Sequence, residues 1–169
     1  NSLLDSAQGQ LLSGISIVLD LCWGSATACG EKIFKALGAN LTTINGEPMG
    51  SKINVGCGST NLNQLREAVF ANNAQMGFAF DGDADRMMAI DQKGRVIDGD
   101  HVLYLWGSFL KQQNKLPDHR LVATSMSNLG LEKAWLSKGG ILERTPVGDR
   151  HVLAAMLANN AKLGGEQSG

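Results

Sequence analysis

The chain has 169 residues, 43% of them hydrophobic and 18% charged, and its formal net charge at pH 7 is −1. This composition is typical of a globular protein with a hydrophobic core, long enough for one large domain or two small ones. It gives no reason to expect nucleic acid or an anionic membrane as a partner, and no apolar run approaches the length of a membrane span.

The cysteines and the chain ends indicate the compartment and the completeness of the protein. Cys22, Cys29 and Cys57 form no C-x-x-C pair, which favours reduced thiols in a cytoplasmic protein. Residues 1–5 lack the basic and apolar regions of a signal peptide. The chain opens without methionine and stops inside a predicted loop, so we expect a piece of a longer protein.

A strand–helix–strand unit comes first along the chain. Residues 15–19 are short and rich in β-branched side chains, which predicts a strand. Apolar residues at helical spacing over 26–37 predict a helix that stops at Gly38, and residues 41–44 predict a second strand. Together they form a β-α-β unit.

A long connection and a second helix follow. Residues 46–58 carry four glycines and a proline, and a loop of this length is more often functional than structural. Asn61 and Gln64 are spaced like a capping pair at the start of the next helix. The apolar face of that helix is predicted to consist of Leu62, Leu65, Val69 and Phe70.

The strand–helix pattern starts again after a hairpin. Residues 87–90 and 95–97 flank a turn with glycine at its special position, which predicts the hairpin. An aspartate at 98–100 suits the N-cap of an apolar helix over 101–111. We place a domain boundary between Asp98 and Gly99.

The second half repeats the α/β alternation. We expect a strand at 121–124, a helix at 129–138, a strand at 140–144 and a last helix leading to Gly164. The inward residues of the two helices are predicted to be Leu131, Ala134 and Trp135, then Val152, Leu153, Met156 and Leu157. Two α/β units in tandem, the second incomplete, are the expected architecture.

The chain is organised around a run of aspartates between two apolar strands. Asp81, Asp83 and Asp85 stand two residues apart, so a tightly turned backbone can aim their carboxylates at one point. Gly82 keeps the turn free of a Cβ, and Arg86 adds a permanent positive charge. Oxygen ligands favour a hard divalent ion, Mg²⁺ or Ca²⁺, over softer metals.

Three kinds of site compete for this loop. An EF-hand calcium loop requires glycine at its sixth position and glutamate at its twelfth, which here are Arg86 and Gln92. A phosphatase of the haloacid-dehalogenase type would use the first aspartate as nucleophile, but a small or hydroxyl residue belongs where Asp85 stands. The third is a Mg²⁺ site for phosphoryl transfer, with Arg86 stabilising phosphate charge.

Two loops carry a resemblance to a known family. Residues 81–86 (Asp-Gly-Asp-Ala-Asp-Arg) resemble the metal-binding loop of the α-D-phosphohexomutases, and residues 165–169 (Gly-Glu-Gln-Ser-Gly) resemble their sugar-binding loop. The resemblance implies tandem three-layer α/β/α domains with mixed sheets, the second truncated. These would be the second family domain, residues 1–98, and most of the third, residues 99–169.

The resemblance also implies functional roles. Asp81, Asp83 and Asp85 would hold Mg²⁺, and the remaining domains of the full-length chain would supply a phosphoserine and a phosphate-binding loop. The residues implied to bind a sugar phosphate are Glu166, Gln167 and Ser168 of the sugar loop, with Asp149 and Arg150 at the entrance of the last helix.

Further matches favour an amino sugar as substrate. Residues 56–60 (Gly-Cys-Gly-Ser-Thr) and Gln167 resemble the members that interconvert glucosamine 6-phosphate and glucosamine 1-phosphate through a bisphosphate, with further matches at 125–131 and 147–150. Members acting on mannose or glucose phosphates are the alternative, and a non-catalytic binding module is another. Lacking the phosphoserine, the chain alone is expected to be inactive.

Several residues have a simpler structural interpretation. Ala84 stands where the family commonly has glycine, and Trp23 replaces a common asparagine with no predicted packing partner. Cys57 has no identifiable base beside it, so a small residue in a tight turn is expected rather than a nucleophile. Trp106 and Trp135 are expected to pack on their helices.

Overall fold

The computed structural model describes residues 11–169. Residues 1–10, which include the start of the first predicted domain and the segment assessed for a signal peptide, lie outside the described residues. The chain divides into two compact units, Asn1–Val96 and Ile97–Gly169, and each is described by itself. The domain limits 1–98 and 99–169 stay a prediction. Among the described residues, no helix has the length and hydrophobicity needed to cross a membrane.

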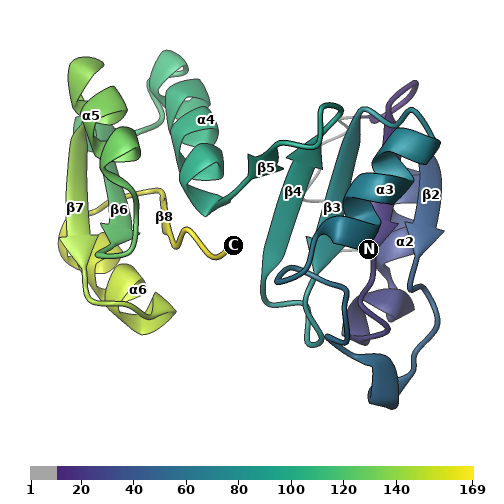
Figure 1. The fold of residues 1–169 in the computed structure, drawn as a ribbon. Helices are drawn as coiled ribbons and strands as arrows, with labels where there is room; N and C mark the ends of the chain where they lie inside the picture. Colours follow the sequence, from purple (N-terminus) through teal and green to yellow (C-terminus); the bar gives the residue numbers. More distant parts are fainter. Residues whose placement is uncertain (1–10) are drawn as a thin grey trace. The chain divides into compact units, whose positions relative to one another are not determined.

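The first unit contains a five-stranded mixed sheet (Figure 1). Its strands run in the order β2-β1-β3-β4-β5. They are β1 (Ser16–Asp20), β2 (Asn40–Ile44), β3 (Met76–Phe80), β4 (Met87–Asp91) and β5 (Val96–Ile97). Strand β1 pairs in parallel with both β2 and β3, whereas β3 and β4 are antiparallel. The predicted β-α-β unit and hairpin are confirmed.

Two helices cover opposite faces of this sheet. They are α2 (Gly30–Ala36) and α3 (Asn63–Ala71), accompanied by the short 3₁₀ turns η1 (Ser25–Ala28) and η2 (Gly50–Lys52). Ile17 and Leu19 of β1 pack in the cluster that contains Phe34 of α2. Val18, on the other face of the same strand, packs with Leu65 of α3. The alternation along β1 therefore builds the expected three layers.

Three local predictions in this unit were wrong. The helix over 26–37 is interrupted at Cys29, whose φ of −137° separates η1 from α2. Helix α3 has Leu62 as its N-cap and no side-chain capping bond, since Gln64 accepts a hydrogen bond from Asn45 instead. Phe70, predicted to face the core, is 50% exposed.

The second unit contains a three-stranded sheet in the order β7-β6-β8 (Figure 1). Its elements are α4 (Gly99–Gln112), the 3₁₀ turn η3 (Pro117–His119), β6 (Arg120–Thr124), α5 (Leu129–Ser137), β7 (Ile141–Thr145), α6 (Asp149–Ala158) and β8 (Gly164–Gly165). Within the described residues, all pairings of this sheet are parallel. The expected N-cap aspartate of α4 is Asp98, which forms a capping box with His101.

Alternate residues of β6 pack into two different parts of the core, one on each face of the sheet. Ala123 packs with Leu103 of α4 and Leu131 of α5. Val122, which faces the other way, packs with Val152 of α6. Helices α4 and α5 thus cover one face, and α6 covers the other.

The inward faces of these helices were predicted only in part. Trp135 is fully buried and donates from Nε1 to the carbonyl of His119 at 2.9 Å. Trp106, by contrast, is 56% exposed, and Leu153 and Leu157 are 56% and 75% exposed. Helix α6 packs on β6 through Val152 and lies against Gly164 of β8, and Leu153 and Leu157 lie outside this contact.

Candidate functional site

The three aspartates converge directly after β3. Oxygen atoms of Asp81, Asp83 and Asp85 all lie within 4.8 Å of one another. Asp81 is 2% exposed, whereas Asp83 and Asp85 are exposed. A donor set of carboxylate oxygens at this separation fits a hard divalent cation such as Mg²⁺.

Arg86 donates hydrogen bonds to Asp81, the buried aspartate of the cluster. Its Nε donates to Oδ2 of Asp81 at 2.8 Å, and its backbone N–H donates to Oδ1 at 3.2 Å. Burial would raise the pKa of Asp81, but these hydrogen bonds outweigh it and lower the pKa below its ordinary value. Hydrogen bonding to Asp81 and repulsion from the carboxylates of Asp81 and Asp83 raise the pKa of Asp85. The cluster thus holds more negative charge than Arg86 neutralises.

Ala84 is the residue of this loop with a left-handed backbone conformation. Ala84 has a φ of 64°, in the left-handed region that side chains disfavour. Its N–H donates to the carbonyl of Asp81 at 3.2 Å, which closes the turn. Glycine at this position would adopt the same geometry without strain.

Gly82 keeps the turn free of a Cβ, as predicted, and the structure shows which neighbours require it. A Cβ on Gly82 would lie 2.4 Å from Cγ2 of Ile53, and a Cβ on Gly24 would lie 2.3 Å from the carbonyl oxygen of Gly82. That same carbonyl accepts a hydrogen bond from the N–H of Ser25 at 2.9 Å. Both glycines are needed because two other loops press against the aspartate loop.

Asp20, which was not predicted as a site residue, ties these loops together. It is fully buried at the end of β1 and accepts hydrogen bonds from the N–H of Cys22 at 2.9 Å and of Gly58 at 2.8 Å. Ser59, one residue on, donates to the carbonyl of Phe80 at 3.1 Å. An aspartate that closes an apolar strand is the signal that could have identified it.

The structure assigns partners to Trp23 and Cys57. Nζ of Lys52 lies 4.4 Å from the centre of the Trp23 ring, a cation–π contact. The Sγ atoms of Cys57 and Cys22 are 3.8 Å apart, and both residues are buried. Burial, followed by the hydrogen bond with Cys22, raises the pKa of Cys57 to about 12. Such a thiol is a poor nucleophile, in agreement with its interpretation as a small turn residue.

Three loops leave the same edge of the second sheet. They follow β6, β7 and β8, which are parallel neighbours, and span residues 125–128, 146–148 and 166–169. Ligands of open α/β sheets commonly bind at the carboxyl ends of the strands. The predicted sugar loop is one of these three.

The sugar loop contacts two neighbouring segments. Oε1 of Glu166 accepts a hydrogen bond from the N–H of Gly148 at 2.7 Å, and the carbonyl of Gln167 accepts one from the N–H of Gly99 at 3.1 Å. Gln167 and Ser168 are half-buried. The contacts of Gly99 and Gly148 with the sugar loop were not predicted, because only the folded chain brings these residues to the loop.

Asp149 and Arg150 are exposed beside this contact. Oδ1 of Asp149 accepts a hydrogen bond from the N–H of Arg150 at 2.7 Å. Nε of Arg150 donates to Nε2 of His151 at 3.3 Å. Among the described residues, these two side chains form no hydrogen bond with the sugar loop.

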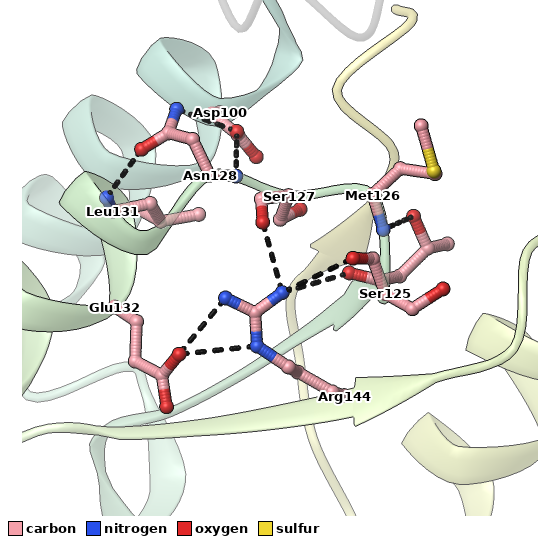
Figure 2. A network of polar contacts seen from close by, with 9 residues as sticks. Asp100, Ser125, Met126, Ser127, Asn128, Leu131, Glu132 and Arg144 are labelled. Atoms are coloured by element: carbon pink, nitrogen blue, oxygen red, sulfur yellow. Dashed lines mark hydrogen bonds and ion pairs between the residues drawn. The ribbon is translucent and has the colours of Figure 1, made fainter.

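Arg144 organises the loop after β6, as Figure 2 shows. Its Nη1 donates to the carbonyl of Ser127 at 2.9 Å, with longer contacts to the carbonyls of Thr124 and Ser125. Glu132 accepts from Nε and Nη2 of the same guanidinium at 3.1 and 2.8 Å. The loop is thus held by its backbone, and the carboxylate of Glu132 balances the charge of Arg144.

Asp100 holds the same loop from the first turn of α4 (Figure 2). It is 3% exposed, and its Oδ2 accepts hydrogen bonds from the N–H and Nδ2 of Asn128, both at 2.8 Å. Asn128 is the N-cap of α5 and accepts from the N–H of Leu131. Oδ1 of Asp100 is buried without a hydrogen-bond partner among the described residues.

The two units match two family domains in order. The family domain described as "Phosphoglucomutase/phosphomannomutase, alpha/beta/alpha domain II" matches residues 3–94. The one described as "Phosphoglucomutase/phosphomannomutase, alpha/beta/alpha domain III" matches residues 98–169. The chain belongs to the phosphoglucomutase/phosphomannomutase family. The expected resemblance and the three-layer fold are confirmed, and family membership removes the reason to consider a phosphatase of the haloacid-dehalogenase type.

Bacterial members of this mutase family share most of the sequence. A phosphoglucosamine mutase of Prochlorococcus marinus is 69% identical over 169 residues, covering 100% of this chain and 37% of the relative. A phosphoglucosamine mutase of Parasynechococcus marenigrum is 66% identical over 169 residues, covering 100% and 37%. The chain therefore spans little more than a third of the length of these relatives.

Solved mutase-family structures share the fold. A phosphoglucomutase/phosphomannomutase family protein from Burkholderia thailandensis has a TM-score of 0.87 at 26% identity, covering 99% of this chain and 37% of that one. An N-acetylglucosamine-phosphate mutase in its apo form has a TM-score of 0.75 at 22% identity, covering 99% and 41%. The second likeness is one of fold alone.

Proposed function

We propose that the full-length protein containing this chain interconverts glucosamine 6-phosphate and glucosamine 1-phosphate. The observation that carries the proposal is the convergence of three carboxylates directly after β3, in a chain that aligns over its whole length with phosphoglucosamine mutases. The reaction is an intramolecular phosphoryl transfer through a phosphoserine and a sugar bisphosphate. The phosphoserine lies outside this chain, so the chain alone does not turn over.

The aspartate loop is the proposed Mg²⁺ site. Asp81, Asp83 and Asp85 would hold the ion, which when bound supplies Lewis-acid polarisation of a phosphoryl group. The buried Asp81 orients the loop, while the exposed Asp83 and Asp85 can rotate toward a ligand. Arg86 keeps its proposed role in stabilising phosphate charge through its outer guanidinium nitrogens, since Nε is bonded to Asp81.

The loops of the second unit are the proposed sugar site. Glu166 and Ser168 offer hydrogen-bonding groups that suit sugar hydroxyls in either orientation, as a reorienting bisphosphate requires. Gln167 is the residue that favours an amino sugar by resemblance. Asp149 and Arg150 are proposed to complete the site from the turn before α6.

The setting of the protein follows from the same proposal. Its partners are a sugar phosphate and the remaining domains of its own polypeptide, with no nucleic acid or membrane. The proposed domains are residues 1–98 and 99–169, and the nearby division between Val96 and Ile97 supports a boundary in this region. A cytoplasmic location agrees with the free thiols of Cys22, Cys29 and Cys57.

A mutase for mannose or glucose phosphates is the second candidate, because the matching family domains carry those names. The deciding experiment assays the full-length enzyme with Mg²⁺ on glucosamine, mannose and glucose 1-phosphates. We expect the highest kcat/KM for glucosamine 1-phosphate and loss of activity after chelation. A preference for mannose or glucose phosphate would select the second candidate, and binding without turnover would indicate a non-catalytic module.

A further inference from the structure

Helix α6 begins without a cap of its own. Its N-cap residue is Gly148, which has φ 121° and ψ 130° and no side-chain capping bond. The first N–H groups of a helix have no partner within the helix and require an acceptor from elsewhere. The N–H of Gly148 finds one in Oε1 of Glu166, at 2.7 Å. The sugar loop therefore places a carboxylate at the positive end of α6, where the helix dipole favours it.

The backbone of Glu166 is itself held in place. Strand β8 pairs with β6 through Gly164 and Gly165, directly before Glu166. A Cβ on Gly99 would stand 1.8 Å from the carbonyl oxygen of Glu166, so the start of α4 approaches the loop as closely as only glycine allows. The N–H of Gly99 donates to the next carbonyl, that of Gln167. With its backbone held on both sides, Glu166 can determine the position of the turn it contacts.

The turn that Glu166 holds carries charged residues of the proposed site. Asp149 and Arg150 follow Gly148 directly, and both are exposed. The Asp149 carboxylate accepts a hydrogen bond from the backbone N–H of Arg150 at 2.7 Å, and this bond orders the backbone between the two residues. The attachment of this turn to the sugar loop is the Glu166–Gly148 hydrogen bond.

We propose that Glu166 is a positioning residue for Arg150, in addition to its role toward the sugar. Its Oε1 fixes the turn at Gly148, and its Oε2 remains for a sugar hydroxyl. This arrangement connects Glu166, which is proposed to bind the sugar, to Arg150, which is proposed to attract the phosphate. The two side chains therefore keep one relative position. The inference rests on the proposed function for what the two side chains contact, but the coupling between them can be measured separately.

Hydrogen exchange in the full-length protein tests the contact itself. We expect Glu166→Ala to speed exchange of the segment 146–150 at least about threefold, since a lost hydrogen bond of typical strength permits a change of that order. Glu166→Gln keeps an acceptor oxygen and is expected to retain most of the protection. Gln167→Ala, one residue away in the same loop, is the matched control and should leave this segment unchanged.

Gly148→Ala tests the same turn from the other side. Among the described residues, the nearest atom to a Cβ on Gly148 would be Cδ2 of His151, at 3.6 Å. The substitution therefore tests the backbone conformation, because the side chain itself has room. We expect exchange over 146–150 to rise as it does in Glu166→Ala, because φ 121° disfavours any side chain.

A double-mutant cycle separates positioning from independent contact with substrate. The cycle combines Glu166→Ala with Arg150→Ala and measures kcat/KM on whichever sugar 1-phosphate the enzyme turns over. If Glu166 places Arg150, then Arg150→Ala costs at least about fivefold less in the Glu166→Ala background, a coupling typical of residues that act together. In the Glu166→Gln background, the effect of Arg150→Ala should return toward its wild-type size.

The results that overturn the inference are distinct from those that overturn the function. Unchanged exchange over 146–150 in Glu166→Ala, or an additive cycle, overturns the coupling whatever the enzyme's substrate. Lack of turnover with every sugar phosphate overturns the proposed function instead, and the exchange measurement then decides the inference by itself.

Discussion

The carboxylate of Asp81 accepts hydrogen bonds from both the side chain and the backbone of Arg86, at 2.8 and 3.2 Å. Asp81 is buried, so this pair sets the shape of the loop before any cation binds. Asp83 and Asp85 remain exposed and adjustable. The loop therefore has one ligand that organises it and two that can respond to an ion.

Replacement of an exposed ligand tests the metal site. Asp83→Asn removes one ligand charge, so we expect Mg²⁺ affinity of the full-length protein to fall at least about tenfold, as changes around metal ligands commonly produce. Isothermal titration calorimetry would measure it. Glu67→Gln, an exposed acid-to-amide change on α3, is the control. Equal Mg²⁺ affinity in Asp83→Asn and wild type would contradict the proposed site.

Glycine at position 84 should relieve strain. Ala84 has φ 64°, and left-handed backbone costs a residue with a Cβ about 1–2 kcal/mol. Glycine also raises the entropy of the unfolded chain, which offsets about 0.4–1 kcal/mol of that gain, so we expect Ala84→Gly to raise the free energy of unfolding by up to about 1.6 kcal/mol. Urea denaturation measures the change. The matched Ala68→Gly, inside α3, should instead cost about 1 kcal/mol, and an equal loss in both variants would refute the strain at Ala84.

The N-cap of α5 should be worth more than an isolated cap. Asn128→Ala removes the cap, worth about 1 kcal/mol, and also takes the Nδ2 donor away from the buried carboxylate of Asp100, which keeps only the backbone N–H of residue 128. We expect a loss of about 2–3 kcal/mol in the free energy of unfolding. Asn128→Ser keeps a capping oxygen and should lose less. If urea denaturation shows the same loss for both, the capping oxygen contributes nothing and the loss comes from the Nδ2 bond to Asp100.

Asp91 should make stability depend on pH. Its carboxylate accepts hydrogen bonds from the backbone N–H and the guanidinium of Arg95, which lower the pKa of Asp91 below its ordinary value. The unfolded chain, with a pKa of about 3.9, then binds more protons than the folded one. The stabilisation is complete above that value and is lost as the pH falls through the folded pKa.

The comparison of wild type with Asp91→Asn isolates this contribution. Urea midpoints between pH 5 and pH 3 should fall less steeply in Asp91→Asn, because the amide does not titrate. Parallel curves for the two proteins would show that Asp91 has the same pKa folded and unfolded.

Much of the fold could be predicted because its determinants are local. The β-α-β unit follows from the switch in apolar period between 15–19, 26–37 and 41–44, and the cap of α4 follows from Asp98 standing directly before the helix. The aspartate loop is also local, since two-residue spacing in one turn suffices to bring Asp81, Asp83 and Asp85 together. The inward faces of helices were predicted less well, because periodicity does not reveal how wide a surface each helix covers.

By itself, the sequence determined the strand and helix order, the family and the group of aspartates that can hold an ion. The tertiary structure alone decided which residues far apart in the chain meet. The Gly99 backbone lies against Glu166, the carboxylate of Glu166 accepts the N–H of Gly148, and Asp20 binds Gly58. Glycine and backbone N–H groups carry no pattern that marks their partners, because such contacts depend on how closely two segments approach after the core has packed.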